Sequence, residues 1–242
     1  MTPATKQLIE IDTETEPSAA VPAIQLKRVT KHFGTGNLRV TAVRDVSLTI
    51  NEGEFAILLG PSGSGKSTLL NIIAGLEAAT EGEILIGGES LVAMSDKALS
   101  RWRAQQVGLM FQSHNLIPVL SSYHNVELAL TLKKYPRKER RTRTVEALER
   151  VGLGDRLHHY PHQLSAGEQQ RVAIARSIVH DPAIVILDEP TGNLDRRNAD
   201  ETLRLLKALN RELRKTIIMV THDVSAIDHA TRVLELNKGV LR

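Results

Sequence analysis

Apolar runs of strand length alternate with segments of helical spacing through most of this 242-residue chain. Phe55–Leu59 and Ala183–Leu187 are continuously apolar, which is typical of strands buried on both faces of a sheet. Buried strands that alternate with helices indicate an α/β fold around a mostly parallel sheet. The same patterns predict further strands at Ile24–Val29, Val40–Ile50, Ile84–Ile86, Val107–Phe111, Thr216–Val220 and Val233–Leu236, and helices at Ser67–Ala74, Leu99–Gln106, Ala166–Val179 and Asp200–Arg214.

Two segments depart from this alternation. Residues 1–22 are rich in Thr, Glu, Pro and Ala and show no sustained period, so we expect a flexible tail. Residues 113–164 are rich in Leu, Arg, Lys and His, with helical spacing around Val126–Leu132 and Arg137–Val151. The chain is therefore predicted to be one domain, 23–242, into which a helical subdomain at about 113–164 is inserted.

Composition excludes several classes of protein. The chain has no cysteine, which rules out disulfides, thiolate metal sites and a cysteine nucleophile. No apolar run approaches the ~18–20 residues that span a bilayer, and no secretory signal pattern is present, so the cytosol is the expected compartment. The formal net charge is +3, which suits an anionic ligand or an anionic membrane face. Aromatic residues make up 3%, too few for a platform that stacks single-stranded nucleic acid.

The strongest chemical signal is a glycine-rich loop between an apolar strand and a helix. It reads Gly60-Pro61-Ser62-Gly63-Ser64-Gly65-Lys66-Ser67-Thr68 and fits the pattern G-x-x-x-x-G-K-[ST]. Glycines let backbone N–H groups converge on phosphate oxygens, and the N-terminus of the following helix adds unpaired donors. Lys66 would place a positive charge on the β- and γ-phosphates, and Ser67 would offer a hydroxyl to Mg²⁺. The loop therefore predicts a nucleoside triphosphate site.

A pair of carboxylates follows a second buried strand. Ile184–Leu187 leads directly into Asp188 and Glu189, and the carboxyl end of a parallel strand is where α/β proteins bind ligands. Asp188 is therefore predicted to hold Mg²⁺, and Glu189 to orient or deprotonate a water that attacks the γ-phosphate.

A third motif, Leu164–Arg171, precedes a helix of small and apolar residues. Ser165 and Glu168 have the S-x-x-E spacing of a capping box. The N–H groups at this helix N-terminus are also predicted to contact a phosphate, and the two interpretations are compatible.

In this order and at these separations, the motifs resemble those of the nucleotide-binding subunit of an ATP-binding cassette (ABC) transporter, from about Ile24 to Arg242. The resemblance implies the ABC ATPase fold, which is a P-loop NTPase core with a mostly parallel sheet, an antiparallel β subdomain and an inserted helical subdomain. It also implies ATP and Mg²⁺ as ligands and ATP hydrolysis as the activity.

The resemblance implies a role for each motif. Gly60–Thr68 is similar to the Walker A loop and Ile184–Asp188 to the Walker B strand, with Glu189 as the catalytic glutamate. Gln112 resembles the Q-loop glutamine that also contacts Mg²⁺, His222 the H-loop histidine, and Phe33 the aromatic residue that stacks on adenine. The signature residues that contact ATP are Ser165, Ala166, Gly167 and Glu168. Asp195, in the segment Gly192–Asp195 that resembles the D-loop, is also expected to contact the nucleotide.

The signature motif departs from the usual family pattern. Ala166 stands where the family usually has the first of two glycines, and its methyl group crowds the approach to phosphate, which would slow an otherwise active ATPase. Glu168 stands where many members have glutamine, and a carboxylate there disfavours an anionic ligand unless it caps the helix.

One Walker A loop and one signature motif imply a head-to-tail homodimer around two ATP molecules. Because the chain has no membrane span, its motion would drive a separate integral membrane permease, with the cassette peripheral to the cytoplasmic face of the membrane. The apolar loop Ser113–Leu120 is a candidate docking surface, or else a loop buried within the domain. Phe111–Leu120, Asn125–Glu127 and Thr191–Asp195 are similar to the branch that powers lipoprotein release and macrolide export, whose permeases carry extracytoplasmic domains.

Two other functions stay open at this point. The same cassette could drive a membrane regulator of a cell-envelope hydrolase without moving a substrate, or act on DNA or ribosomes. The last class usually has coiled-coil insertions or two cassettes, and neither is seen in this sequence. The basic stretch Lys133–Arg143 is read as a solvated helix face or a contact with anionic lipid rather than a nucleic-acid site.

Overall fold

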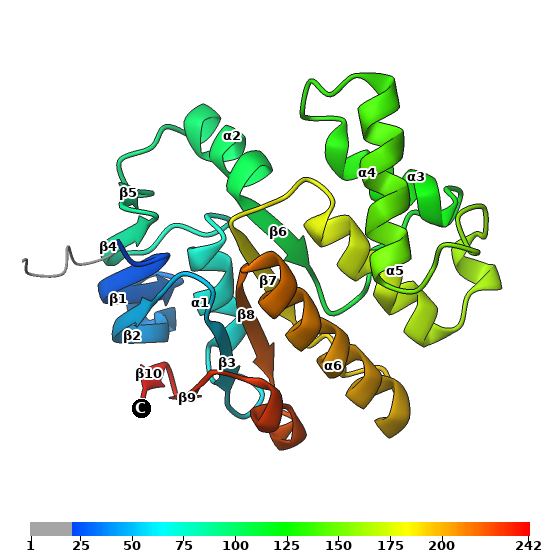
Figure 1. Ribbon diagram of the computed structural model, residues 1–242. Helices are drawn as coiled ribbons and strands as arrows, with labels where there is room; N and C mark the ends of the chain where they lie inside the picture. The colour runs from blue at the N-terminus through cyan, green and yellow to red at the C-terminus, as the bar shows by residue number, and fades with distance from the viewer. Residues whose placement is uncertain (1–20) are drawn as a thin grey trace, which may run out of the picture.

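Two sheets form the frame of the computed structural model, which describes residues 21–242, so that the predicted tail lies outside the described residues except for Val21 and Pro22. The larger sheet has the strand order β10-β9-β3-β8-β7-β6, and all its strands but β10 run parallel (Figure 1). Its strands are β3 (Phe55–Leu59), β6 (Val107–Met110), β7 (Ile184–Asp188), β8 (Thr216–Thr221), β9 (Arg232–Asn237) and β10 (Val240–Leu241).

The smaller sheet is antiparallel and has the order β2-β1-β4-β5. Its strands are β1 (Ile24–Phe33), β2 (Val40–Ile50), β4 (Glu81–Ile86) and β5 (Glu89–Ser90). It lies on the left of Figure 1, and α1 (Lys66–Ile73) packs between it and the larger sheet with Leu69 and Ile72 buried. The predicted combination of a mostly parallel sheet and an antiparallel β subdomain is therefore confirmed.

Alternating side chains of the central strands enter two different hydrophobic clusters. Ala56 and Leu58 of β3 pack in the cluster shared with α1 and the antiparallel sheet, while Phe55 and Ile57 pack in the cluster on the opposite face. Strands covered on both faces must be apolar at every position, which is why Phe55–Leu59 reads as an unbroken apolar run.

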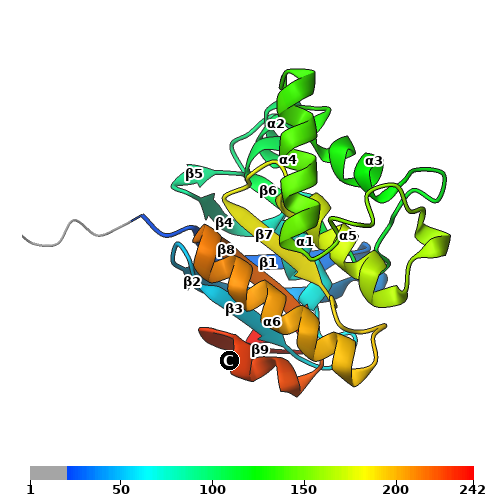
Figure 2. The ribbon, with the colours of Figure 1, turned by 45° about the vertical axis from the view of Figure 1, so that its right-hand side comes forward.

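Helices α5 (Ala166–Ile178) and α6 (Arg196–Leu213) supply apolar residues to the second cluster. Helices α3 (Ser122–Glu127) and α4 (Arg137–Arg150) pack on α5. They lie together at the right in Figure 1, away from the antiparallel sheet, and Figure 2 shows α3, α4 and α5 next to one another. The remaining elements are α2 (Asp96–Gln106) and the short 3-10 turns η1 (Gly36–Leu38), η2 (Leu128–Leu130), η3 (Pro161–Gln163) and η4 (Val224–His229).

Several predicted bounds were wrong at helix starts. Helix α6 begins at Arg196 rather than Asp200, because the Asp195 carboxylate accepts a hydrogen bond from the Asn198 N–H at 2.9 Å and caps the helix. The helix predicted at Val126–Leu132 instead starts at Ser122 and continues as η2. The two-residue strands β5 and β10 were not predicted, since two residues carry no period.

No helix within residues 21–242 combines the length and the apolar character needed to cross a bilayer. The boundary of the helical subdomain at 113–164 stays a prediction.

Candidate functional site

The predicted catalytic groups meet at one edge of the parallel sheet. Leu59, the last residue of β3, pairs with Thr221, and Asp188 of β7 pairs with Val220, so the residues that follow these strands are neighbours. They border a cavity of about 700 Å³. Its lining comprises Val40, Thr41, Ala42, Pro61, Ser62, Gly63, Gly65, Lys66, Ser67, Thr68, Gln112, Glu189 and His222.

Close packing explains why the loop needs glycine at two positions. A Cβ at Gly60 would lie 2.2 Å from the Leu236 carbonyl oxygen, and one at Gly65 would lie 2.1 Å from the Ala42 carbonyl oxygen. Gly65 also has φ +98°, a left-handed conformation that disfavours any other residue. Without side chains at these two positions, the loop backbone packs directly against β9 and β2. Helix α1 then begins at Lys66, directly after Gly65.

The loop holds a buried positive charge, that of Lys66. Lys66 is 7% exposed, and its Nζ donates to the carbonyls of Gly60 at 2.7 Å and Pro61 at 3.0 Å. Within the described part of the chain no carboxylate forms an ion pair with it, and the buried Ser64 hydroxyl has no hydrogen-bond partner. A buried cation and an unpaired hydroxyl at a helix N-terminus fit the phosphates of a nucleotide.

Oxygen donors predicted to hold Mg²⁺ lie next to the loop. The Ser67 hydroxyl donates to Asp188 Oδ1 at 3.4 Å, and Gln112 faces the same cavity as Ser67. Burial raises the pKa of Asp188, and the neighbouring Glu189 acts in the same direction, while the Ser67 hydrogen bond opposes the rise. A hydroxyl, an amide and a carboxylate whose charge is disfavoured by burial fit a hard divalent cation.

Glu189 is held in a strained conformation. Its φ is +50°, which costs an ordinary residue roughly 1–2 kcal/mol, and its N–H donates to the Val220 carbonyl at 2.9 Å. The carboxylate accepts a hydrogen bond from Thr221 Oγ1 at 3.3 Å and contacts His222 Nδ1 at 3.0 Å. A carboxylate fixed from two sides at the cavity wall is suited to accept a proton from water.

Phe33 is placed beside the cavity but does not line it. It pairs with Val40, which does line the cavity. Phe33 is 42% exposed, and Lys31 Nζ lies 4.9 Å from its ring centre. The stacking of adenine on Phe33 therefore stays a prediction.

The signature and D-loop residues are also absent from the lining of this cavity. Ser165 caps α5, Asp195 caps α6, and a Cβ at Gly167 would lie 2.7 Å from Asn198 Oδ1, so the two helix N-termini pack against each other. Within one copy the structure thus separates Ser165–Glu168 and Asp195 from the residues around the cavity. Ala166 is the exposed first residue of α5.

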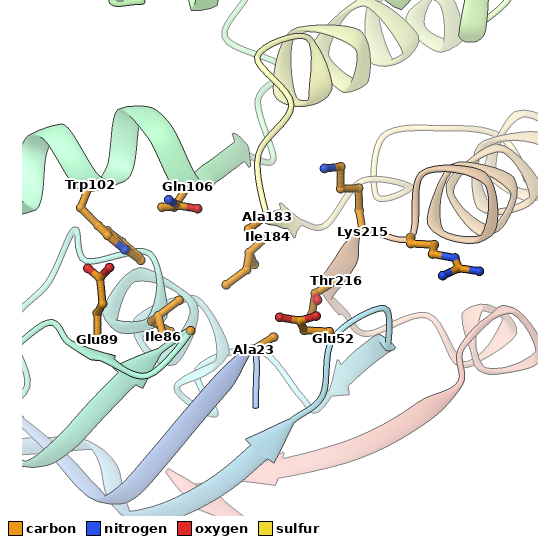
Figure 3. A pocket seen from close by; sticks show the side chains of 12 residues that line it. Ala23, Glu52, Ile86, Glu89, Trp102, Gln106, Ala183, Ile184, Lys215 and Thr216 are labelled. Carbon is orange, nitrogen blue, oxygen red and sulfur yellow. The ribbon is translucent and has the colours of Figure 1, made fainter. Parts of the chain in front are cut away.

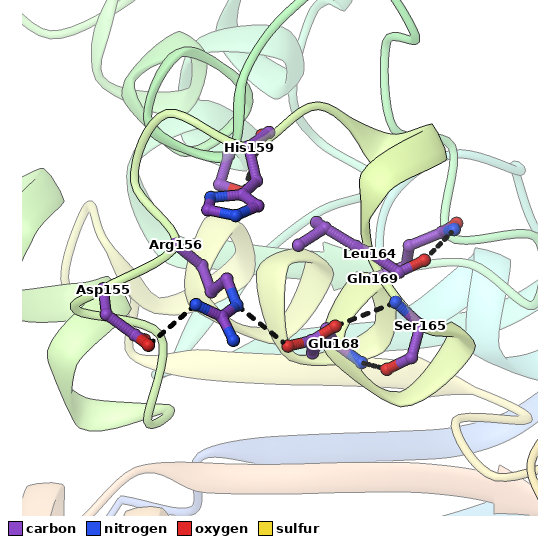
Figure 4. A network of polar contacts seen from close by, with 8 residues as sticks. Asp155, Arg156, His159, Leu164, Ser165, Glu168 and Gln169 are labelled. Carbon is purple, nitrogen blue, oxygen red and sulfur yellow. Dashed lines mark hydrogen bonds and ion pairs between the residues drawn. The ribbon is translucent and has the colours of Figure 1, made fainter.

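The predicted capping box at Ser165 is confirmed (Figure 4). The Glu168 N–H donates to Ser165 Oγ at 3.2 Å, and the Ser165 N–H donates to Glu168 Oε2 at 2.8 Å. The Arg156 Nε donates to the other carboxylate oxygen at 3.2 Å. The Ser165 hydrogen bond holds the pKa of Glu168 below its usual value, and Arg156 contributes to the same shift.

Sequence reasoning missed three parts of this arrangement. Val40–Ala42 line the cavity, but their alternation indicates only a strand. Thr221 supports Glu189, and its position directly after an apolar strand was the available signal. Arg156 lies twelve residues before Glu168 in an irregular turn, where no pattern marks it.

A second cavity, of about 360 Å³, lies at the opposite edge of the parallel sheet (Figure 3). Ile184 and Thr216, the first residues of β7 and β8, line it together with Trp102 of α2. In Figure 3, Trp102 and Lys215 stand on opposite sides of this space. None of the predicted site residues lines it, so it is separate from the candidate nucleotide site.

Comparisons with known proteins agree with this geometry. Residues 43–192 match the protein family described as "ABC transporter". The lipoprotein-releasing system ATP-binding protein LolD of Alcanivorax borkumensis is 41% identical over 223 residues, which cover 92% of this chain and 98% of LolD. The macrolide export ATP-binding/permease protein MacB of Rhodopseudomonas palustris is 43% identical over 218 residues, which cover 90% of this chain and 33% of MacB.

A solved structure matches over almost the whole described chain. It is the dimeric ATP-binding cassette MJ0796 of Methanocaldococcus jannaschii in a post-hydrolysis state bound to ADP and Pi, with a TM-score of 0.82 and 41% identity over 90% of this chain and 97% of that one. The resemblance noted in the sequence and the predicted ABC ATPase fold are thereby confirmed. The chain belongs to the ABC transporter family and is the ATP-binding, ATP-hydrolysing subunit of such a transporter.

Proposed function

We propose that two copies of this chain bind two ATP molecules between them. Each ATP would lie between Gly60–Thr68 of one copy and Ser165–Gly167 of the other. Two observations support this arrangement: the signature residues lie outside the cavity of their own copy, and the cassette MJ0796 is dimeric in its solved structure. The γ-phosphate would contact both copies, so its removal weakens the closed dimer and opens it.

The residues around the cavity supply the chemistry of hydrolysis. Lys66 neutralises phosphate charge, and Glu189 takes a proton from the attacking water. His222 contacts Glu189 through Nδ1, which leaves its Nε2 available to a phosphate oxygen. Ser67, Gln112 and Asp188 would hold Mg²⁺, which supplies charge neutralisation at the phosphates.

The dependence of ATPase activity on protein concentration tests the shared site. If two copies build each site, the specific activity falls when the protein is diluted below its dimerisation constant. If each copy carries a complete site, the specific activity is constant and the proposal is wrong. Lys66→Ala is the control, since it removes the phosphate-binding charge and should abolish activity at every concentration.

We further propose that the cassette works at the cytoplasmic face of the membrane with an integral permease of the lipoprotein-release or macrolide-export type. The similarity to LolD, and to the part of MacB that this chain covers, supports this assignment. The extracytoplasmic domain expected of such a permease belongs to the same proposal. The proposal includes no nucleic-acid partner.

The loop 113–120 is the proposed receiving surface for a cytoplasmic helix of that permease. Hydrogen bonds hold the backbone of this loop in place. The side chain of the buried Asn125 accepts the Ile117 N–H and donates to the Ile117 and Leu120 carbonyls. Arg176 donates to the His114 and Asn115 carbonyls. Its outer side carries Val119, which is 79% exposed. A fixed loop with an exposed apolar tip is suited to pass movement to a partner.

Co-purification from detergent-solubilised membranes tests the partner assignment. A tagged chain should retain a multi-span protein with a large extracytoplasmic domain, and Val119→Asp should retain less of it while its ATPase activity without the partner stays unchanged. Retention of a partner linked to a cell-envelope hydrolase would favour the regulatory alternative, and retention of nucleic acid or ribosomes would contradict the assignment.

A further inference from the structure

Glu168 places a negative charge at a helix N-terminus that, in the proposed dimer, faces ATP. The carboxylate is not free, because each of its oxygens has a partner (Figure 4). Oε2 accepts the Ser165 N–H at 2.8 Å, and Oε1 accepts Arg156 Nε at 3.2 Å. The Ser165 hydroxyl oxygen accepts the Glu168 N–H, and within the described residues its hydrogen is donated to no group.

Arg156 comes from a turn that its own backbone fixes. Its N–H donates to the Leu153 carbonyl at 3.0 Å, and its carbonyl accepts the His159 N–H at 3.1 Å. The buried Leu153, 1% exposed, anchors the turn in the hydrophobic cluster beside α4 and α5. The guanidinium therefore reaches Glu168 from a fixed base, while its Nη1 bonds Asp155 Oδ2 at 2.8 Å.

We propose that Arg156 is a positioning residue for the shared ATP site, acting through Glu168 and Ser165. It offsets part of the Glu168 charge, since it also pairs with Asp155, and it keeps the Glu168 carboxylate turned onto the Ser165 N–H. The Ser165 hydroxyl and the N-terminus of α5 then meet the γ-phosphate with less repulsion between like charges. The inference rests on the proposed function, because the signature residues meet ATP only when two copies close on it.

Charge explains why the chain needs this arginine. A phosphate and an unpaired carboxylate repel each other, and the repulsion grows when closure removes water from between them. Glutamine at the position of Glu168 would cap the helix through its amide oxygen and bring no charge. The carboxylate therefore creates a requirement for a cation, and Arg156 is the cation that the structure places on it.

The test measures the protein concentration at which specific ATPase activity is half-maximal. Arg156→Gln should raise that concentration about tenfold, the size expected when a partly exposed, charge-assisted hydrogen bond is lost. Arg156→Lys keeps the charge and should recover most of the loss. Binding of a fluorescent ATP analogue to dilute, monomeric protein should not change, because Arg156 does not line the cavity of its own copy.

The deciding comparison repeats Arg156→Gln in a Glu168→Gln background. Without the carboxylate, removal of the arginine should shift the half-maximal concentration by less than about twofold relative to Glu168→Gln alone. Arg150→Gln, an exposed arginine at the end of α4, is the matched control for loss of one positive charge.

Two results would overturn the inference. An equal shift in both backgrounds would mean that Arg156 only supports the fold, and thermal unfolding without nucleotide would show the corresponding loss of stability. No shift in either background would mean that Arg156 has no role at the shared site. A wild-type activity independent of concentration would instead refute the proposed dimer, and the inference would fall with it.

Discussion

His180 gives a pH dependence of stability that can be worked out from the structure. His180 follows the end of α5 and is 6% exposed, and its Nε2 lies 3.2 Å from the Val107 carbonyl oxygen. Its Nδ1 has no hydrogen-bond partner among residues 21–242. The pKa of His180 is lowered to about 4, chiefly by burial and also by Lys133 and Lys215, against the opposing effects of the Val107 hydrogen bond and Asp181. The folded protein therefore holds this histidine neutral at pH values where the unfolded chain protonates it.

The sign and size follow from linkage. Below about pH 6.5 the unfolded chain takes up a proton at this position and the folded protein does not, so stability is lost as the pH falls from 6.5 towards 4. Between pH 7 and pH 5 the loss from this one group is about 2 kcal/mol. Below pH 4 the folded protein also binds the proton, and no further stability is lost through this histidine.

Urea unfolding of the wild type and of His180→Gln at pH 7 and pH 5 measures this effect. The glutamine amide keeps an N–H donor for Val107 but does not titrate. The wild type should lose about 2 kcal/mol more than the variant between the two pH values, since all other titrating groups are common to both. An equal loss in the two proteins would refute the assignment of a buried, neutral His180.

Two further predictions concern the loops of the site. Gly65→Ala should cost more than about 2 kcal/mol of stability and abolish ATP binding, because its Cβ would strike the Ala42 carbonyl oxygen, whereas Gly63→Ala, at φ +76° with open space around it, should cost only about 1–2 kcal/mol in urea unfolding. Equal costs would contradict this steric reading. Asn125→Ala removes the side-chain partner of the Ile117 N–H and of the Leu120 carbonyl, while the Ile117 and Ser121 carbonyls each keep a backbone hydrogen bond. It should cost about 3 kcal/mol and speed amide exchange at Ile117, and an unchanged exchange rate there would contradict the anchoring.

The parts of the fold that the sequence predicts are those with strong local patterns. Phe55–Leu59 and Ile184–Leu187 are apolar throughout because both faces of the larger sheet are covered, and that signal is independent of distant contacts. Helix α6 begins four residues before the predicted Asp200, because the Asp195 carboxylate accepts the Asn198 N–H and caps the helix, and this contact is visible only in the structure.

Some residues of the candidate site can be recognised from the sequence, and others only from the structure. Lys66, Asp188 and Glu189 are recognisable because their motifs couple a residue type to the end of a strand or the start of a helix. Thr221 and Arg156 act through side chains of other residues, and such contacts depend on how elements far apart in the sequence pack. The spacing of Ser165 and Glu168 predicts the capping box, but nothing in it indicates that Arg156 completes the cap.

The mass of the Glu189→Gln protein in solution tests the central claim most directly. Without the carboxylate that takes the proton, the variant should bind ATP without hydrolysing it, so the closed dimer should accumulate. Light scattering with ATP and Mg²⁺ should then show a shift from 26.7 kDa to about 53 kDa, twice the mass of one chain, and no shift with ADP. A variant that binds ATP and stays at 26.7 kDa would contradict the account.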